Sequence, residues 1–166
     1  QDCRSCHNWG AGVFLGINTW QLNGNLTYPG ESAPSNQLNA WNAEGLFSTT
    51  LEAASTYPAA VAVDDATASL ELRMRSYLAA NCSNCHNPAG GLNTGFDLRF
   101  ATTLEDTNLI NGELLYDLGI SGAHVVTPQN PETSILHRRM NTTDVHKMPP
   151  IGRNVIDQTA VNTLNQ

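Results

Sequence analysis

The chain has few charged residues and no long apolar run, and each shortage limits what the protein can be. No stretch of its 166 residues approaches the roughly 20 consecutive apolar residues that cross a bilayer, so we expect no insertion into a membrane. Charged residues make up only 14% of the chain, and the net charge is −7. Because nucleic acids and anionic membrane surfaces repel a negative protein, we expect neither as a partner and favour a basic partner or none.

The sequence patterns of common catalytic sites are missing as well. There is no Ser-His-Asp order, no glycine-rich phosphate loop after an expected strand, and no pair of carboxylates in a supporting context. These absences favour a protein that is not an enzyme.

Two copies of one short motif, C-x-x-C-H, are the most informative feature that is present. The motif attaches c-type haem covalently, since its two thiols add to the two vinyl groups of the porphyrin. The His lies four residues after the first Cys, on the same face of a helical turn, and can reach the iron. We therefore predict two covalently bound haem c groups, one held by Cys3, Cys6 and His7 and the other by Cys82, Cys85 and His86.

The four cysteines allow two other interpretations, a zinc site and a pair of disulfides. Neither needs a His directly after the second Cys of each motif. With five His in 166 residues, two such His arise by chance about once in a thousand sequences. The separation of Cys3 from Cys82 is also far longer than the spacing of ordinary zinc ribbons. The haem interpretation is therefore preferred over both.

The first motif has almost no sequence in front of it, because only Gln1 and Asp2 precede Cys3. We expect its haem to be covered by later parts of this chain or by another molecule. Trp9 and Trp20 either flank the macrocycle or fill the core. No signal peptide is present, yet haem attachment of this kind takes place outside the cytoplasmic membrane. We therefore expect a periplasmic or extracellular protein whose signal peptide has been removed.

Helix signals are clearest around the second motif. A helix is expected from Asp64 or Asp65 to Asn81, leading directly into Cys82, with an apolar stripe of Leu70, Met74, Tyr77 and Leu78. Other helices are expected over residues 36–46, from a start at Asn130-Pro131-Glu132, and after Asp157. Residues 96–100 are expected to be extended, and residues 22–35, rich in Asn, Gly, Pro and Ser, to form a surface loop.

Three stretches together resemble the secreted bacterial c-type cytochromes of the cytochrome c-like haem-binding class. They are residues 75–86, 128–140 and 148–152, and the resemblance covers about residues 64–164. Residues 3–7, 21–23 and 36–38 more loosely resemble a longer family of uncharacterised haem proteins. The resemblance implies a mainly α fold with much loop, in which residues 1–62 form a loop-rich N-terminal haem-binding segment. Residues 63–166 then form a cytochrome c-like haem domain, and the whole is one compact unit.

Each iron takes a proximal His, and the position opposite needs His or Met for electron transfer. The resemblance implies Met148 as the distal ligand of the second haem, with His146 as a competitor. For the first haem we predict His124, followed by His146. Met74 and Met140 are expected in the core, and His137 at the surface.

Electron transfer is the function that these features favour, either by a soluble carrier or by the subunit of an extracellular polymer with a continuous row of haems. Its partners would be redox proteins or extracellular electron acceptors, and further copies of the chain in the polymeric case. The alternatives are a dihaem peroxidase, which needs one five-coordinate haem with an acid–base residue beside it, and a haem module of a larger oxidoreductase.

Overall fold

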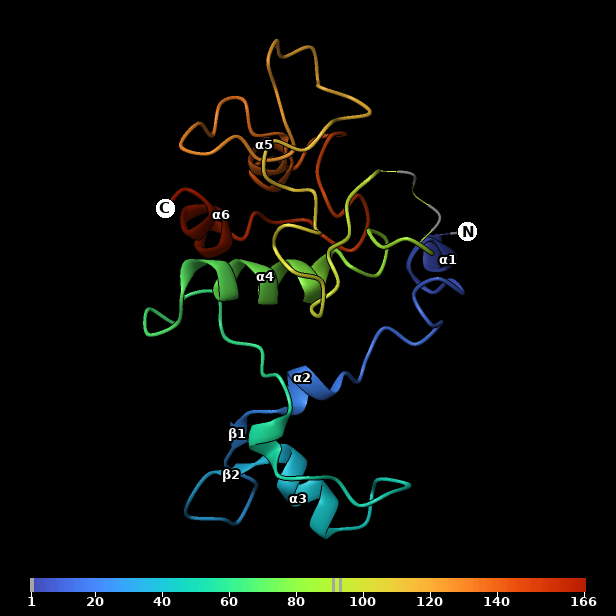
Figure 1. The fold of residues 1–166 in the computed structure, drawn as a ribbon, viewed down its shortest axis with the longest axis vertical. Helices are drawn as coiled ribbons and strands as arrows, with labels where there is room; N and C mark the ends of the chain where they lie inside the picture. The colour runs from blue at the N-terminus through green and yellow to red at the C-terminus, as the bar shows by residue number, and fades with distance from the viewer. Residues whose placement is uncertain (1, 91, 93) are drawn as a thin grey trace. The chain divides into compact units, whose positions relative to one another are not determined.

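Short helices joined by long loops make up the part of the chain that the computed structural model describes, residues 2–90, 92 and 94–166 (Figure 1). The mainly helical, loop-rich character predicted from the sequence is confirmed. In chain order the elements are α1 (Asp2–Cys6), α2 (Thr19–Leu22), β1 (Asn25–Leu26), β2 (Ser35–Asn36), α3 (Gln37–Ala43), the 3₁₀ helix η1 (Ala54–Thr56), α4 (Leu70–Asn81), α5 (Ile135–Met140) and α6 (Gln158–Leu164).

The chain divides into two compact units. The larger unit joins the residues up to Leu15 with Ala62–Gln166, and the smaller unit is Gly16–Val61. This grouping differs from the predicted segment 1–62, because the first C-x-x-C-H motif belongs to the same unit as the second. Both motifs therefore lie in the larger unit.

Helix α4 is the longest element and ends at the second motif. It begins at Leu70, where the Ser69 side chain accepts a hydrogen bond from the amide of Leu72. The predicted start near Asp65 was wrong, because that carboxylate accepts hydrogen bonds from Thr67 in a turn before the helix. The predicted apolar stripe is buried at Met74 and Leu78, but Leu70 is exposed.

A buried arginine on α4 was not predicted. Arg73 is 8% exposed, and its guanidinium donates to the carbonyl oxygen of Val63 at 2.9 Å, to Thr163 Oγ1 at 3.2 Å and to Gln166 Oε1 at 3.2 Å. Because a buried cation needs its donors satisfied, these bonds compensate its removal from water. Arg73 thereby ties α4 to α6 and to the segment that enters α4.

Helices α5 and α6 complete the larger unit. Helix α5 begins at Ile135 and not at the predicted Asn130-Pro131, because the Ser134 hydroxyl folds back onto the carbonyl oxygens of Thr127 and Asn130 and fixes a turn there. Helix α6 begins as predicted, with the Asp157 side chain accepting from the amide of Ala160 at 3.0 Å.

The apolar core of the larger unit gathers side chains from these helices and from the loop segments around them. Its buried members are Met74, Leu78, Leu98, Leu109, Val125, Met140, Ala160 and Val161. The predictions that Met74 and Met140 belong to the core are confirmed. In the part of the chain that is described, no helix is long and apolar enough to cross a membrane.

The smaller unit is organised around Asn23. Its side-chain amide donates to the carbonyl oxygens of Ala54 and Tyr57 and accepts from the Asn36 amide at 2.9 Å. Strands β1 and β2 pair antiparallel, with Asn25 opposite Asn36. Asn36 also caps α3 through the amides of Leu38 and Asn39, and so the helix predicted over residues 36–46 is confirmed in a shorter form.

Candidate functional site

The two C-x-x-C-H motifs meet at one cavity of about 650 Å³. Helix α1 carries Cys3 and Cys6, and Cys82 stands at the C-terminal cap of α4. The cavity is lined by Cys6 from the first motif and by Cys82, Cys85 and His86 from the second, together with Met148. Residues that are far apart in the sequence thus face the same space.

The contact between the motifs is direct. The side chain of Cys85 is hydrogen-bonded to that of Cys6. Close by, Gly10 approaches the carbonyl group of Ala89 so tightly that any side chain at position 10 would collide with it. The N-terminal segment therefore packs against the loop that follows the second motif. The sequence analysis expected either later parts of this chain or another molecule beside the first motif, and later parts of this chain do contact it.

The loop after the second motif holds His86 through alternate residues. The Nδ1 atom of His86 lies 3.2 Å from Thr94 Oγ1, the Phe96 ring stacks on the imidazole at 4.6 Å between centroids, and the Leu98 amide donates to the His86 carbonyl oxygen at 2.9 Å. With Nδ1 engaged, Nε2 is the nitrogen left for a ligand.

His7 is held in the same way by a different partner. Its Nδ1 atom lies 2.7 Å from the carbonyl oxygen of Val13. A carbonyl oxygen can only accept, so Nδ1 carries the proton and Nε2 keeps its lone pair. The His7 side chain is exposed, and so is Trp9, at 92%. Trp9 lines the shared cavity and is not core filler, while Trp20 belongs to the smaller unit.

A second, mostly apolar cavity of about 140 Å³ lies on the other side of the second motif. Cys82, His86 and Met148 line both cavities. The remaining lining of the smaller cavity is Thr94, Phe96, Leu98, Glu113, Leu114, Leu115, Tyr116, Val125, Ile135, Leu136 and Arg139. Its mostly apolar lining would bury part of an apolar ring favourably, because side chains there replace water.

Met148 is held in place by Arg139. The amide of Met148 donates to the carbonyl oxygen of Arg139 at 3.0 Å, and Arg139 Nη1 donates to the carbonyl oxygen of His146 at 3.0 Å. The segment His146–Met148 is thus fastened to α5 on both sides of Lys147. Met148 therefore lines both cavities together with His86.

Burial controls the acid–base properties of the second motif. Burial raises the pKa of the Cys82 thiol to about 12, and burial and the neighbouring Cys6 raise the pKa of Cys85. Burial and then the positive charge of Arg139 lower the pKa of His86. At neutral pH these thiols are protonated and the imidazole is neutral. A neutral imidazole is the form that binds a metal, and a thioether needs no thiolate once formed.

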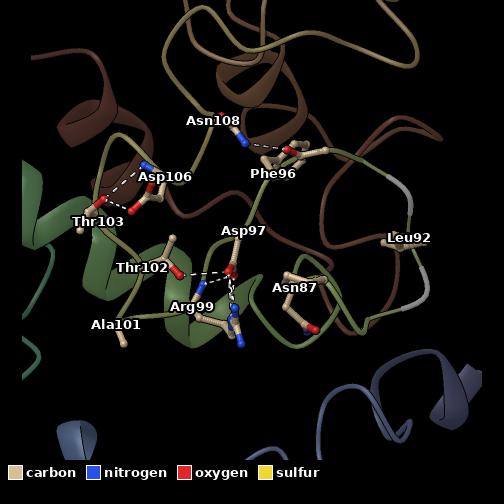
Figure 2. A pocket seen from close by; sticks show the side chains of 12 residues that line it. Asn87, Leu92, Phe96, Asp97, Arg99, Ala101, Thr102, Thr103, Asp106 and Asn108 are labelled. Carbon is tan, nitrogen blue, oxygen red and sulfur yellow. Dashed lines mark hydrogen bonds and ion pairs between the residues drawn. The ribbon is translucent and has the colours of Figure 1, made fainter.

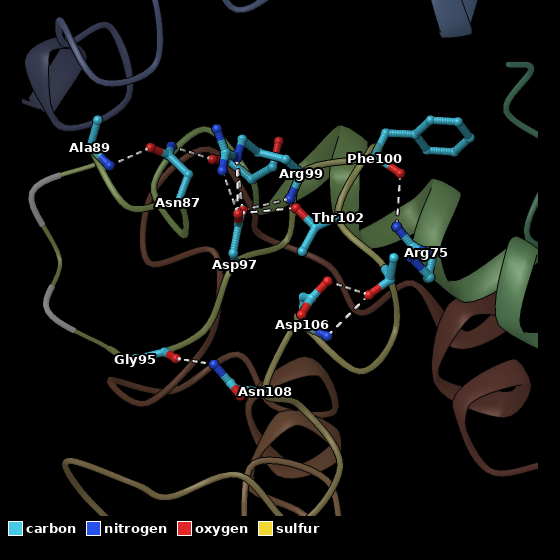
Figure 3. Close-up of polar contacts among 12 residues, drawn as sticks. Arg75, Asn87, Ala89, Gly95, Asp97, Arg99, Phe100, Thr102, Asp106 and Asn108 are labelled. Carbon is cyan, nitrogen blue, oxygen red and sulfur yellow. Dashed lines mark hydrogen bonds and ion pairs between the residues drawn. The ribbon is translucent and has the colours of Figure 1, made fainter.

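A third cavity, of about 760 Å³, lies behind the same loop and has a mixed polar and apolar lining (Figure 2). At its centre Asp97 accepts hydrogen bonds from Arg99 at 2.6 Å and from Thr102 Oγ1 at 3.0 Å (Figure 3). Burial alone would raise the pKa of Asp97, but the hydrogen bonds from Arg99 and Thr102 outweigh it and hold that pKa below its usual range. This network fixes the loop whose other side contacts His86.

The structure places the other predicted ligands elsewhere. His124 is half-buried and joins Ser134 through a single parallel bridge, and among the described residues it lines neither cavity of the motifs. His146 lines a separate surface pocket together with His137. His137 was expected at the surface, but it is half-buried and its Nε2 atom is buried without a hydrogen-bond partner. The predicted use of His124 and His146 at the first motif therefore finds no support in their placement.

The donor set at the second motif fits a covalently attached haem. Two cysteines, an imidazole with Nδ1 engaged, and a methionine line two mostly apolar cavities that share Cys82, His86 and Met148. Within the described residues, no three His, Cys, Asp or Glu side chains come together as a metal-ion site.

Thr94, Phe96 and Arg139 are site residues that sequence reasoning missed. Thr94 and Phe96 had no periodic signal, because Gly95 between them has a φ of +77° and the segment is not a regular strand. Arg139 had no signal either, because nothing in the sequence distinguishes it from Arg138 beside it.

No protein-family model, no curated protein and no solved structure matches the chain.

Proposed function

We propose that this protein transfers electrons through two covalently attached haem c groups, one on Cys3, Cys6 and His7 and one on Cys82, Cys85 and His86. The observation that carries the proposal is that Cys6 of the first motif lines one cavity together with Cys82, Cys85 and His86 of the second motif and with Met148. The resemblance of residues 64–164 to secreted c-type cytochromes supports a cytochrome c-like domain. It also supports a periplasmic or extracellular location.

A bound haem would supply a one-electron couple at its iron. The cysteines would anchor the macrocycle, and His7 and His86 would present Nε2 because a hydrogen bond engages Nδ1 in each ring. Met148 would offer its thioether sulfur as a further ligand to the group held by the second motif. The leucines, isoleucine and valine of the smaller cavity would exclude water, which limits the solvent reorganisation that accompanies a change of charge.

The contact between Cys6 and Cys85 favours exchange between the two sites. Because these side chains are hydrogen-bonded, the two attachment points are neighbours in one body. An electron that reaches one site therefore has a short path to the other. Redox partner proteins or extracellular acceptors would take it from there.

The count of axial ligands favours a polymeric version of this function. Two irons with His or Met on both sides need four such ligands. Among the described residues, His86 and Met148 line the two cavities, and His7 belongs to the first motif. The other His and Met residues lie in the core or at other surfaces. A second copy of the chain would supply the fourth ligand, and repetition would give a row of haems. The exposure of Trp9 and of Phe14, at 92% and 82%, leaves apolar surface for such a contact.

Spectra and size separate these possibilities. The proposal expects two reversible one-electron steps in a potentiometric titration of the purified protein. A filament or large homo-oligomer in size-exclusion chromatography and negative-stain images supports the polymer, and a sharp monomer supports the soluble carrier. If cyanide or peroxide changes the spectrum of one haem, that iron has an open position and the peroxidase alternative replaces electron transfer.

A further inference from the structure

We propose that Arg139 sets the reduction potential of the second haem, as a fixed positive charge in the cavity that contains His86 and Met148. The inference rests on the proposed function, since it concerns a group held by the second motif. It assigns to this arginine a positioning and tuning role, with no contact to a substrate.

The placement of Arg139 is the first observation. Arg139 lines the small apolar cavity together with Cys82, His86 and Met148. Its neighbour Arg138 points elsewhere and pairs with Glu132 at 2.7 Å on an exposed face. Consecutive residues on a helix point in directions about 100° apart, so α5 sends one arginine toward the site and the other away.

The charge of Arg139 is not cancelled by an ion pair in the part of the chain that is described. Its guanidinium donates to a neutral group, the carbonyl oxygen of His146, at 3.0 Å. Glu113 also lines the cavity, and it is exposed to solvent, which screens its charge. Arg139 is half-buried and therefore acts on the cavity through a lower dielectric.

The same residue positions Met148. Its carbonyl oxygen receives the Met148 amide at 3.0 Å, and Arg153 Nη2 donates to that oxygen at 3.3 Å. Arg153 also donates to the carbonyl oxygens of Met140 and Thr142. The end of α5 and the Met148 segment are thus locked together, which keeps the guanidinium at a constant position relative to both proposed ligands.

The expected direction follows from electrostatics. The oxidised form of the iron site carries one more positive charge than the reduced form. A fixed cation beside it disfavours the oxidised form and raises the reduction potential.

The test compares Arg139→Gln and Arg139→Met with Arg138→Gln as the matched control and Arg139→Lys as the charge-conserving variant. Each purified protein is first assayed for covalent haem by pyridine haemochrome, and both potentials are then measured by spectroelectrochemical titration. We expect one of the two potentials to fall by about 59 mV in the neutral variants, which for one electron is a factor of about ten in the redox equilibrium. The other potential should change by no more than about twofold in the redox equilibrium. The same limit applies to both potentials of Arg138→Gln and of Arg139→Lys.

The outcomes are distinguishable. Wild-type protein without covalent haem removes the proposed function itself. Two haems in every variant with unchanged potentials overturns the role of Arg139 and leaves the function standing. If neither neutral variant acquires the second haem while Arg139→Lys does, the positive charge is required at this site and the assignment is supported. If Arg139→Lys fails in the same way, the arginine acts through its shape alone and the assignment is overturned.

Discussion

The imidazole of His86 is oriented by Thr94, whose Oγ1 atom lies 3.2 Å from Nδ1. This contact decides which ring nitrogen is available to a ligand. It belongs to a set of three, since the Phe96 ring and the Leu98 amide contact the same histidine. The loop that follows the motif thus orients the His86 side chain as much as the motif does.

Thr94→Val should raise the potential of the second haem. The hydrogen bond that Nδ1 donates makes the imidazole a stronger donor to iron and favours the oxidised form, so its loss favours the reduced form. The expected change is at most about tenfold in the redox equilibrium, about 59 mV. Thr103→Val is the control, since the Thr103 hydroxyl donates to Asp106 at 2.6 Å in the third cavity. Equal potentials in both variants would show that Thr94 does not set the tautomer.

Met148→His should convert the second haem from His–Met to His–His ligation. The ferric spectrum should lose its near-infrared Met–iron band, and the potential should fall, because Met ligation raises the potential relative to His. Met140→Leu is the control, since Met140 is 4% exposed and belongs to the core. Retention of the Met–iron band in Met148→His would assign the distal ligand to another residue.

Much of the fold could be predicted from local signals. Asp157 and Asn36 cap helices α6 and α3 through bonds to amides two and three residues ahead, and such bonds depend only on nearby sequence. The start of α5 could not be found in this way. There the Ser134 hydroxyl bonds back to Thr127 and Asn130, and this turn outcompetes the helix start that Asn130-Pro131 favours.

Asp97→Asn should lower the free energy of unfolding at pH 7 by about 1 kcal/mol, because Asn keeps the hydrogen bonds in part but loses the charge that faces Arg99. The folded pKa of Asp97 lies below its unfolded value, so its contribution is present above pH 4 and is lost as the pH falls through the folded pKa. The difference between wild type and Asp97→Asn should therefore shrink below about pH 4 in a denaturant titration series.

Asp106→Asn provides the comparison for that series. Asp106 lines the same cavity, is exposed, and accepts a hydrogen bond from the Thr103 hydroxyl. Its substitution should change the free energy of unfolding less than that of Asp97 at pH 7. A pH-independent difference for Asp97→Asn would mean that packing, and not charge, explains its effect.

Arg73→Ala should destabilise the larger unit by about 2 to 3 kcal/mol. The variant leaves the carbonyl oxygen of Val63 and the Thr163 hydroxyl without their donor in a buried place. Arg138→Ala removes an exposed pair with Glu132 and should cost no more than about 1 kcal/mol. Thermal unfolding followed by circular dichroism measures both. Similar losses in the two variants would argue against a structural role for the buried arginine.

Part of the candidate site could also be predicted from local sequence, and part depends on contacts between distant residues. The residues of each motif are evident from spacing alone, and Met148 from its resemblance to the Met-Pro-Pro stretch of c-type cytochromes. The contact of Cys6 with Cys85 depends on the packing of Gly10 against Ala89, which joins distant parts of the chain. The choice between Arg138 and Arg139 depends on the rotation of α5, which only the three-dimensional structure fixes.

The most direct test of the central claim is the number of covalent haems per chain, measured by intact mass together with a pyridine haemochrome assay. The account predicts two in the wild-type protein and one in each of the variants Cys3→Ser/Cys6→Ser and Cys82→Ser/Cys85→Ser. A colourless wild-type protein whose mass equals that of the polypeptide alone, with its cysteines as thiols, disulfides or zinc ligands, would contradict it.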